Sequence, residues 1–149
     1  METIHDYMKA DHERCDASFE RAAGAARTGN LPTLAREFAA FLRRISVHIQ
    51  AEERLLFPAI EERTGMSGGP TKVMNGEHRV MEALFERMQA AATGGDCDAY
   101  LRASEQVMQI LAEHNQKEER MLYPMLDEAM GDDVGPLLAE VKAMFASVE

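Results

Sequence analysis

An internal repeat with a shift of 66 residues constrains the fold of this chain most strongly. Residues 48–62, HIQAEERLLFPAIEE, align with residues 114–128, HNQKEERMLYPMLDE, and eight of the fifteen positions are identical. The same shift, without a gap, aligns three further pairs upstream: His12 with His78, Asp16 with Glu82, and residues 19–21 with residues 85–87. Repeated units of this size stack and bury their apolar faces against each other. The repeat therefore predicts two similar halves related by a pseudo-twofold axis.

The segments between the Gly and Pro clusters have the pattern of amphipathic helices. They are rich in Ala, Leu, Glu, Arg and Met, their apolar residues recur at spacings of three and four, and none alternates with a period of two. Thr3 with Asp6 resembles a capping box, Asn30 and Asp96 are N-cap residues, and Pro70 suits a first helical turn. The sequence predicts four long helices and a short fifth one, at about residues 3–27, 31–63, 71–92, 97–130 and 134–148.

Because every predicted element is a helix, the sequence predicts an all-α fold. The connections between the helices are short, and helices joined by few residues pack antiparallel. We expect an up-down antiparallel four-helix bundle with a short C-terminal fifth helix. Residues 1–149 would form a single domain, with hairpins at about 3–63 and 71–130 and the last helix at about 134–148. Pro58 and Pro124, at equivalent positions of the repeat, are expected to kink or end their helices.

Composition excludes several classes of protein. The chain has 149 residues of which 46% are hydrophobic, enough for a core, so it is not a disordered segment. Its net charge of −10 repels phosphate backbones, which argues against nucleic acid as a partner. No apolar run approaches the roughly 18–20 residues that a bilayer requires, and no apolar leader begins the sequence. Two cysteines are too few for a disulfide scaffold and suit a reducing compartment, so we expect a cytoplasmic protein. We also expect no membrane contacts, and either a monomer or a weak homodimer.

One histidine in each predicted long helix is followed four residues later by a carboxylate. Residues at i and i+4 lie on one helical face, about 40° and about 6 Å apart, and that face is otherwise apolar. Burying unpaired charges would cost several kcal/mol each, a large part of a total stability of about 5–15 kcal/mol. A bound metal would satisfy all of these groups. The pairs are His12 with Asp16, His48 with Glu52, His78 with Glu82, and His114 with Glu118.

This pattern resembles the hemerythrin-like family, also called the HHE cation-binding domain. The resemblance covers about residues 3–130 and rests on one set of residues: His12, His48-x-x-x-Glu52, His78 and His114-x-x-x-Glu118. In that family two iron ions lie in the bundle, bridged by two carboxylates and an oxygen species. The resemblance implies that His12 and His48 hold one ion, that His78 and His114 hold the other, and that Glu52 and Glu118 bridge them. Zinc and manganese are possible substitutes for iron.

Two departures from the oxygen-carrying hemerythrins affect the expected function. Those proteins have a further histidine where this chain has Glu82, and their last motif is HxxxxD rather than His114-x-x-x-Glu118. Fewer imidazoles make a harder, more anionic site, which weakens the case for reversible O₂ carriage. Ferritin-like diiron sites use Glu-x-x-His at i, i+3, a spacing these pairs lack.

Several neighbouring residues have two interpretations. Glu82 is either a ligand or a hydrogen-bond partner of a ligand histidine, and Asp16 is either a ligand or part of a surface ion pair. Glu53 and Glu119 point about 100° away from the bridging candidates, so we expect them in solvent. His5 is expected at the surface or the end of the bundle.

The remaining candidates are expected mainly in the core. Tyr7 and Tyr123 are expected to pack there, with hydrogen bonding to the site as the alternative, and Cys15 is expected to be a small buried residue. A methionine stripe has core packing as its first interpretation and a small-molecule tunnel as its second; it consists of Met74, Met81 and Met88.

The sequence therefore predicts a non-haem diiron protein that binds or senses O₂, NO or peroxide. One alternative is a regulatory or structural protein with an iron or zinc clamp, docking a partner through its fifth helix. Another is an iron-handling or peroxide-detoxifying protein. No catalytic residue is assigned, so binding is favoured over an enzymatic activity.

Overall fold

The computed structural model describes residues 1–149, and almost all of them are helical. No strand is present, which confirms the predicted all-α class. The α-helices are α1 (Ile4–Thr28), α2 (Leu31–Ala51), α3 (Phe57–Thr64), α4 (Pro70–Thr93), α5 (Cys97–Lys117), α6 (Tyr123–Met130) and α7 (Val134–Phe145).

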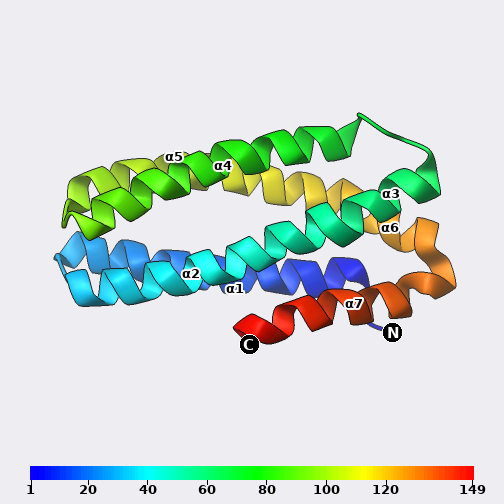
Figure 1. The fold of residues 1–149 in the computed structure, drawn as a ribbon, viewed down its shortest axis with the longest axis horizontal. Coiled ribbons are helices and arrows are strands. Elements are labelled where there is room, and N and C mark those ends of the chain that lie inside the picture. The colour runs from blue at the N-terminus through cyan, green and yellow to red at the C-terminus, as the bar shows by residue number, and fades with distance from the viewer.

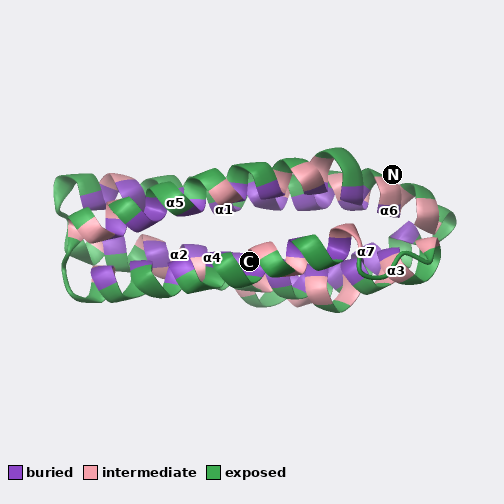
Figure 2. Ribbon diagram, turned by 90° about the horizontal axis from the view of Figure 1, so that it is seen from above, coloured by how far each residue is buried: buried purple, intermediate pink, exposed green.

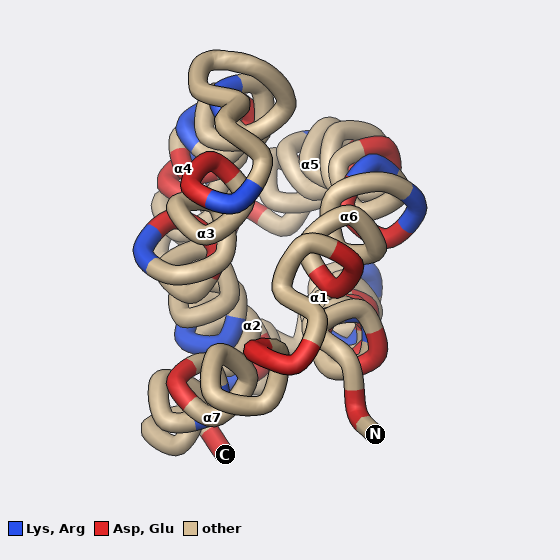
Figure 3. Tube along the Cα trace, turned by 90° about the vertical axis from the view of Figure 1, so that its right-hand side faces the viewer, with Lys and Arg blue, Asp and Glu red and all other residues tan.

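The helices form the predicted up-down antiparallel bundle. α1 pairs with α2 and α4 with α5, while α1 also packs on α5 and α2 on α4. α3 and α6 continue the paths of α2 and α5, so each half of the chain is one long hairpin (Figure 1). Seen from the end that carries α3 and α6, the four helical paths surround a common centre and α7 lies beside α2 (Figure 3).

The helix starts follow the signals in the sequence. The side-chain oxygens of Thr3, Asn30 and Asp96 each accept a hydrogen bond from the backbone N–H three residues later, at 3.0 to 3.2 Å. These bonds satisfy donors that the first helical turn leaves free. At the other end of α1, Gly29 adopts φ 71°, a left-handed conformation that favours glycine.

A π-helical turn interrupts each of the two paths that were expected to kink or end at a proline. These turns are η1 (Glu52–Leu56), between α2 and α3, and η2 (Glu118–Leu122), between α5 and α6. In each turn the residue after the segment donates its N–H to the carbonyl five residues earlier. Pro58 and Pro124 are the second residues of α3 and α6, directly after these turns, and the helical path continues beyond them. The wider turn accommodates a residue without an N–H, so the chain does not stop there.

Two apolar clusters fill the bundle, one on each side of a polar layer. Along α1, Met8 belongs to one cluster and Cys15 to the other, and His12 lies between them. Along α4, His78 lies between Met74 and Met81 in the same way. Figure 2 shows buried residues along the inner faces of the helices. The methionine stripe and Cys15 are thus parts of the core, as their first interpretation held.

α7 covers one side of the bundle near the N-terminus (Figure 1). Its Phe145 ring is buried, with its centroid 5.6 Å from the ring of Tyr7 and 6.3 Å from that of His48. Val141 is buried as well. The apolar residues that would form a docking surface on this helix are therefore covered by the bundle itself. No helix in the structure combines the length and the apolarity needed to cross a membrane.

Candidate metal centre

Six buried side chains from four helical paths meet in the polar layer. They form two groups in which each residue offers one nitrogen or oxygen, and these atoms lie within 4.8 Å of one another. Both carboxylates belong to both groups, so the layer has two neighbouring positions that share two anionic residues. The first group is His12, His48, Glu52 and Glu118, and the second is Glu52, His78, His114 and Glu118.

Each shared carboxylate faces one histidine of each group. Glu52 places Oε1 3.1 Å from Nε2 of His78 and Oε2 3.6 Å from Nε2 of His48. Glu118, its copy in the repeat, has its two oxygens 3.1 Å from the Nε2 atoms of His12 and His114. A carboxylate whose two oxygens serve different positions has the arrangement of a bridging ligand.

One buried oxygen in this layer has no hydrogen-bond partner. Oε2 of Glu118 lies 3.1 Å from Nε2 of His114, but the two atoms are not aligned for a hydrogen bond. A buried carboxylate oxygen without a donor is costly, and buried charges in proteins are paired or coordinate metals. Imidazole nitrogen and carboxylate oxygen together suit iron, zinc and manganese. The residues present therefore fit a pair of metal ions.

The Nδ1 atom of every histidine in the layer lies 2.7 or 2.8 Å from a carboxylate oxygen. An ionised carboxylate only accepts hydrogen bonds, so Nδ1 is the donor and Nε2 is directed to the centre. Such partners fix the tautomer and the ring orientation of metal-ligating histidines. The pairs are His12 with Glu119, His48 with Asp11, His78 with Glu53, and His114 with Glu77.

The prediction that Glu53 and Glu119 face solvent is wrong. Glu52 and Glu53 hold opposite nitrogens of the same ring, that of His78. Glu52 and Glu53 are the first two residues of the π-helical turn η1. The backbone there departs from the regular α-helix, in which successive side chains point about 100° apart. Glu119 follows Glu118 in η2 in the same way. The signal was available in the sequence, because this Glu-Glu-Arg triplet is identical in both copies of the repeat.

Asp11 and Glu77 were not singled out from the sequence, although both are acidic and both directly precede a histidine at equivalent positions of the repeat. Cations hold both of them in place. Nε of Arg44 lies 2.6 Å from Oδ1 of Asp11, and Nζ of Lys117 lies 2.6 Å from Oε2 of Glu77. These contacts favour the ionised carboxylates that the histidines need as acceptors.

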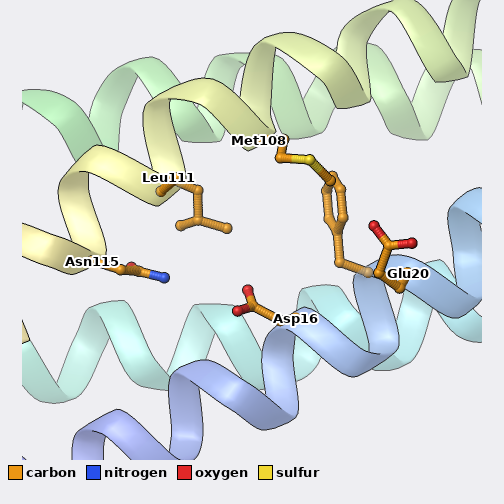
Figure 4. A pocket seen from close by; sticks show the side chains of 7 residues that line it. Asp16, Glu20, Met108, Leu111 and Asn115 are labelled. Carbon is orange, nitrogen blue, oxygen red and sulfur yellow. The ribbon is translucent and has the colours of Figure 1, made fainter.

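The structure places Asp16 and Glu82 outside both groups. Oε1 of Glu82 accepts from Nε of Arg79 at 2.7 Å on the surface of α4. Asp16 is exposed and lines a pocket of about 260 Å³ between α1 and α5, where Figure 4 shows it beside Leu111 and Asn115. Neither carboxylate contacts a histidine of the two groups by hydrogen bond or ion pair.

His5 and Tyr7 lie away from the two groups. The Nδ1 atom of His5 is 3.3 Å from Asp6 at the end of the bundle, where this histidine was expected. The hydroxyl of Tyr7 donates a hydrogen bond to Glu149 at 3.4 Å.

Tyr123, in contrast, brings a hydroxyl into the first group. This hydroxyl donates to Oε2 of Glu52 at 2.6 Å and lies 3.1 Å from Oε1 of Glu118. It also lies 3.3 Å from Nε2 of His48 and 3.4 Å from Nε2 of His12. Burial raises the pKa of this phenol well above 10, and the two glutamate charges raise it further. Tyr123 therefore combines core packing with hydrogen bonding to the site.

Neighbouring carboxylates make His48 and His114 stronger bases in the metal-free protein. Burial lowers the pKa of His48, but Glu52 and Asp11 outweigh burial and raise that pKa to about 10. For His114, burial also lowers the pKa, and Glu118 with the other carboxylates raises it to about 9. Protons therefore occupy the layer near neutral pH when no metal is bound, and a metal ion must displace them.

Comparison with protein families gives one match. The model of the hemerythrin HHE cation-binding domain matches residues 3–126. Comparisons with curated proteins and with solved structures gave no match. The matched segment spans all four helical paths and contains both groups of side chains. The chain belongs to the hemerythrin HHE cation-binding domain family.

Proposed function

We propose that this protein binds two iron ions in the polar layer. His12 and His48 hold the first ion, His78 and His114 hold the second, and Glu52 and Glu118 bridge them. One observation carries this assignment: each of the two carboxylates directs its two oxygens at histidines of different groups. Zinc and manganese accept the same donors, but two histidine nitrogens with shared carboxylates in a helical bundle suit iron well.

We further propose that the centre binds or senses O₂, NO or peroxide. Two imidazole nitrogens and two bridging oxygens per ion leave coordination positions of a six-coordinate ion to be filled from outside. When bound, iron supplies redox chemistry and affinity for such small molecules. The apolar clusters on both sides of the layer limit access by bulk water and by larger compounds.

The chain's own residues prepare the centre by orientation and charge. The four Nδ1–carboxylate hydrogen bonds hold the imidazoles with Nε2 directed inward. Such preorganisation avoids rearrangement when a cation enters. The two buried carboxylates make the layer anionic and favour higher positive charge on the ions. That property suits a sensing, redox or iron-handling role better than reversible carriage.

Metal analysis combined with anaerobic titration tests the proposal. Metal-free protein is loaded with ferrous iron without oxygen, and the iron content is measured after desalting; we expect about two ions per chain. NO, O₂ and peroxide are then added to separate samples while absorbance is recorded, and a change in the spectrum is expected. The variant His48→Ala should lose iron, whereas His5→Ala should retain it.

Three outcomes would overturn parts of the proposal. Failure to take up iron rejects the diiron assignment. Preferential retention of zinc supports the alternative of a structural metal clamp. Full iron content with no spectral response to NO, O₂ or peroxide rejects the small-molecule role and leaves a metal-binding protein of another kind.

A further inference from the structure

The two halves of the centre differ in one aromatic residue. Tyr123 directs its hydroxyl into the first group, as described above. Its copy in the repeat is Phe57, which stacks on His78 with ring centroids 5.9 Å apart and an interplanar angle of 11°. Phe57 has no hydroxyl, so the second group has no corresponding oxygen. The pseudo-twofold symmetry of the centre is broken at this pair.

The hydroxyl of Tyr123 has the spacing of a metal ligand. Bonds from nitrogen or oxygen to such metals are about 2.1 Å long, so two ligands at right angles lie about 3 Å apart. In an octahedral, six-coordinate ion, each ligand atom therefore has four other ligand atoms at about 3 Å. The Tyr123 oxygen lies 2.6 to 3.4 Å from four such atoms. These four atoms come from the members of the first group: His12, His48, Glu52 and Glu118.

We propose that the phenolic oxygen of Tyr123 is a fifth protein ligand of the ion held by His12 and His48. The ion held by His78 and His114 then has one protein ligand fewer, so external molecules bind there. This inference rests on the proposed diiron function. On coordination the O–H bond breaks, its proton leaves to solvent, and an oxygen–metal bond forms. The step needs no oxidant, because the charge of the cation stabilises the phenolate.

Without metal, Tyr123 is a hydrogen-bond donor to Glu52 at 2.6 Å. This hydrogen bond holds the hydroxyl at the first position, and the hydroxyl changes partner when a cation arrives. Phe57 cannot make this exchange, so the inequality of the two positions is built into the sequence.

Spectroscopy of the ferric protein tests this assignment. A phenolate bound to ferric iron gives a visible charge-transfer band and resonance-enhanced ring vibrations of tyrosine. Iron-loaded, oxidised protein should show both features. Tyr123→Phe should lose both while it still binds about two ions per chain. Tyr7→Phe is the matched control and should keep both, because the Tyr7 hydroxyl contacts Glu149.

A gain-of-function variant tests the inequality of the two ions. Phe57→Tyr adds a phenol beside the second group and should strengthen the charge-transfer band and weaken NO binding. Mössbauer spectra should show two distinct irons in the natural protein and a smaller difference between them in Tyr123→Phe.

The band decides the assignment even if Phe57→Tyr does not fold. Absence of the band from protein that contains two irons would overturn the role of Tyr123, and so would its survival in Tyr123→Phe. Failure to bind iron at all is a different result, which overturns the proposed function itself.

Discussion

His48 donates its Nδ1–H to Asp11, with 2.7 Å between the nitrogen and Oδ2, and the other oxygen of Asp11 accepts from Arg44 at 2.6 Å. The second half of the chain repeats this arrangement with Glu77 between His114 and Lys117. The two copies differ in burial. The side chain of Asp11 is 0% exposed and that of Glu77 is 25% exposed.

This difference predicts unequal effects of two matched substitutions. Asp11→Asn and Glu77→Gln should each lower metal affinity by about 10–100-fold, because each removes the partner that orients a ligand. Asp11→Asn should also lower the free energy of unfolding by about 3 kcal/mol, since Arg44 loses a buried counter-charge. The more exposed Glu77→Gln should cost less than about 1 kcal/mol. Urea denaturation of the metal-free variants measures both values, and equal destabilisation would contradict the role assigned to burial.

Substitution of the bridging residues should affect both ions at once. Glu52→Ala and Glu118→Ala each remove a carboxylate that belongs to both groups, so each should reduce the iron content at both positions. The repeat makes their effects similar in size. Glu82→Gln is the matched control, because Glu82 contacts Arg79 and lies outside the groups. Two irons per chain in Glu52→Ala, with unchanged melting, would show that the bridging assignment is wrong.

Metal removal should lower the melting temperature. A ligand that binds only the folded state stabilises it by about 4 kcal/mol when its concentration is a thousand times its dissociation constant. For a chain of this length each kcal/mol corresponds to about 2–4 °C, so chelation should lower the melting temperature by about 8–16 °C. Calorimetry with and without chelator measures this shift. Identical transitions for the two samples, with iron content verified before heating, would argue against a buried centre.

The stability of the metal-free protein should fall as pH rises above neutrality. Burial lowers the pKa of His48 and of His114, but neighbouring carboxylates outweigh burial and raise these pKa values to about 10 and about 9. The pKa of an unfolded histidine is about 6.5. The folded state therefore binds more protons between these values. Its extra stability is complete below about pH 6.5 and is lost as pH rises through about 9 to 10.

Urea midpoints of metal-free protein at a series of pH values between 6 and 9 measure this trend. His48→Gln removes one of the histidines whose pKa is raised in the folded state, so it should flatten the dependence. A midpoint that increases with pH over this interval would contradict the charge arrangement. Metal affinity should change in the opposite sense, since ligation requires unprotonated Nε2 atoms.

Local chemistry and the repeat made much of this protein predictable. The spacing of apolar residues predicted the helices, and the capping oxygens of Thr3, Asn30 and Asp96 are used as expected. Both follow from interactions within a few residues. The repeat supplied the long-range information, because two copies of one hairpin place equivalent histidines at one level of the bundle. The predicted family and architecture are confirmed on this basis.

The partners of the histidines on their outer sides could not be derived in this way. A regular α-helix would point Glu53 away from the centre. Glu52 and Glu53 instead belong to a π-helical turn, in which both contact the imidazole of His78. That turn depends on backbone hydrogen bonds with the period i to i+5, which side-chain periodicity does not reveal.

The sequence by itself determined the helices, their pairing into two equivalent hairpins and the six side chains that meet in the core. Only the tertiary structure decided which atoms face one another across the bundle. Tyr123 shows why. Its aromatic ring has the pattern of a core residue, and its distance from His12 along the chain contains no information about contact. Packing of α1 against α6 brings the hydroxyl within 3.4 Å of that histidine, because contacts between helices depend on how whole surfaces fit together.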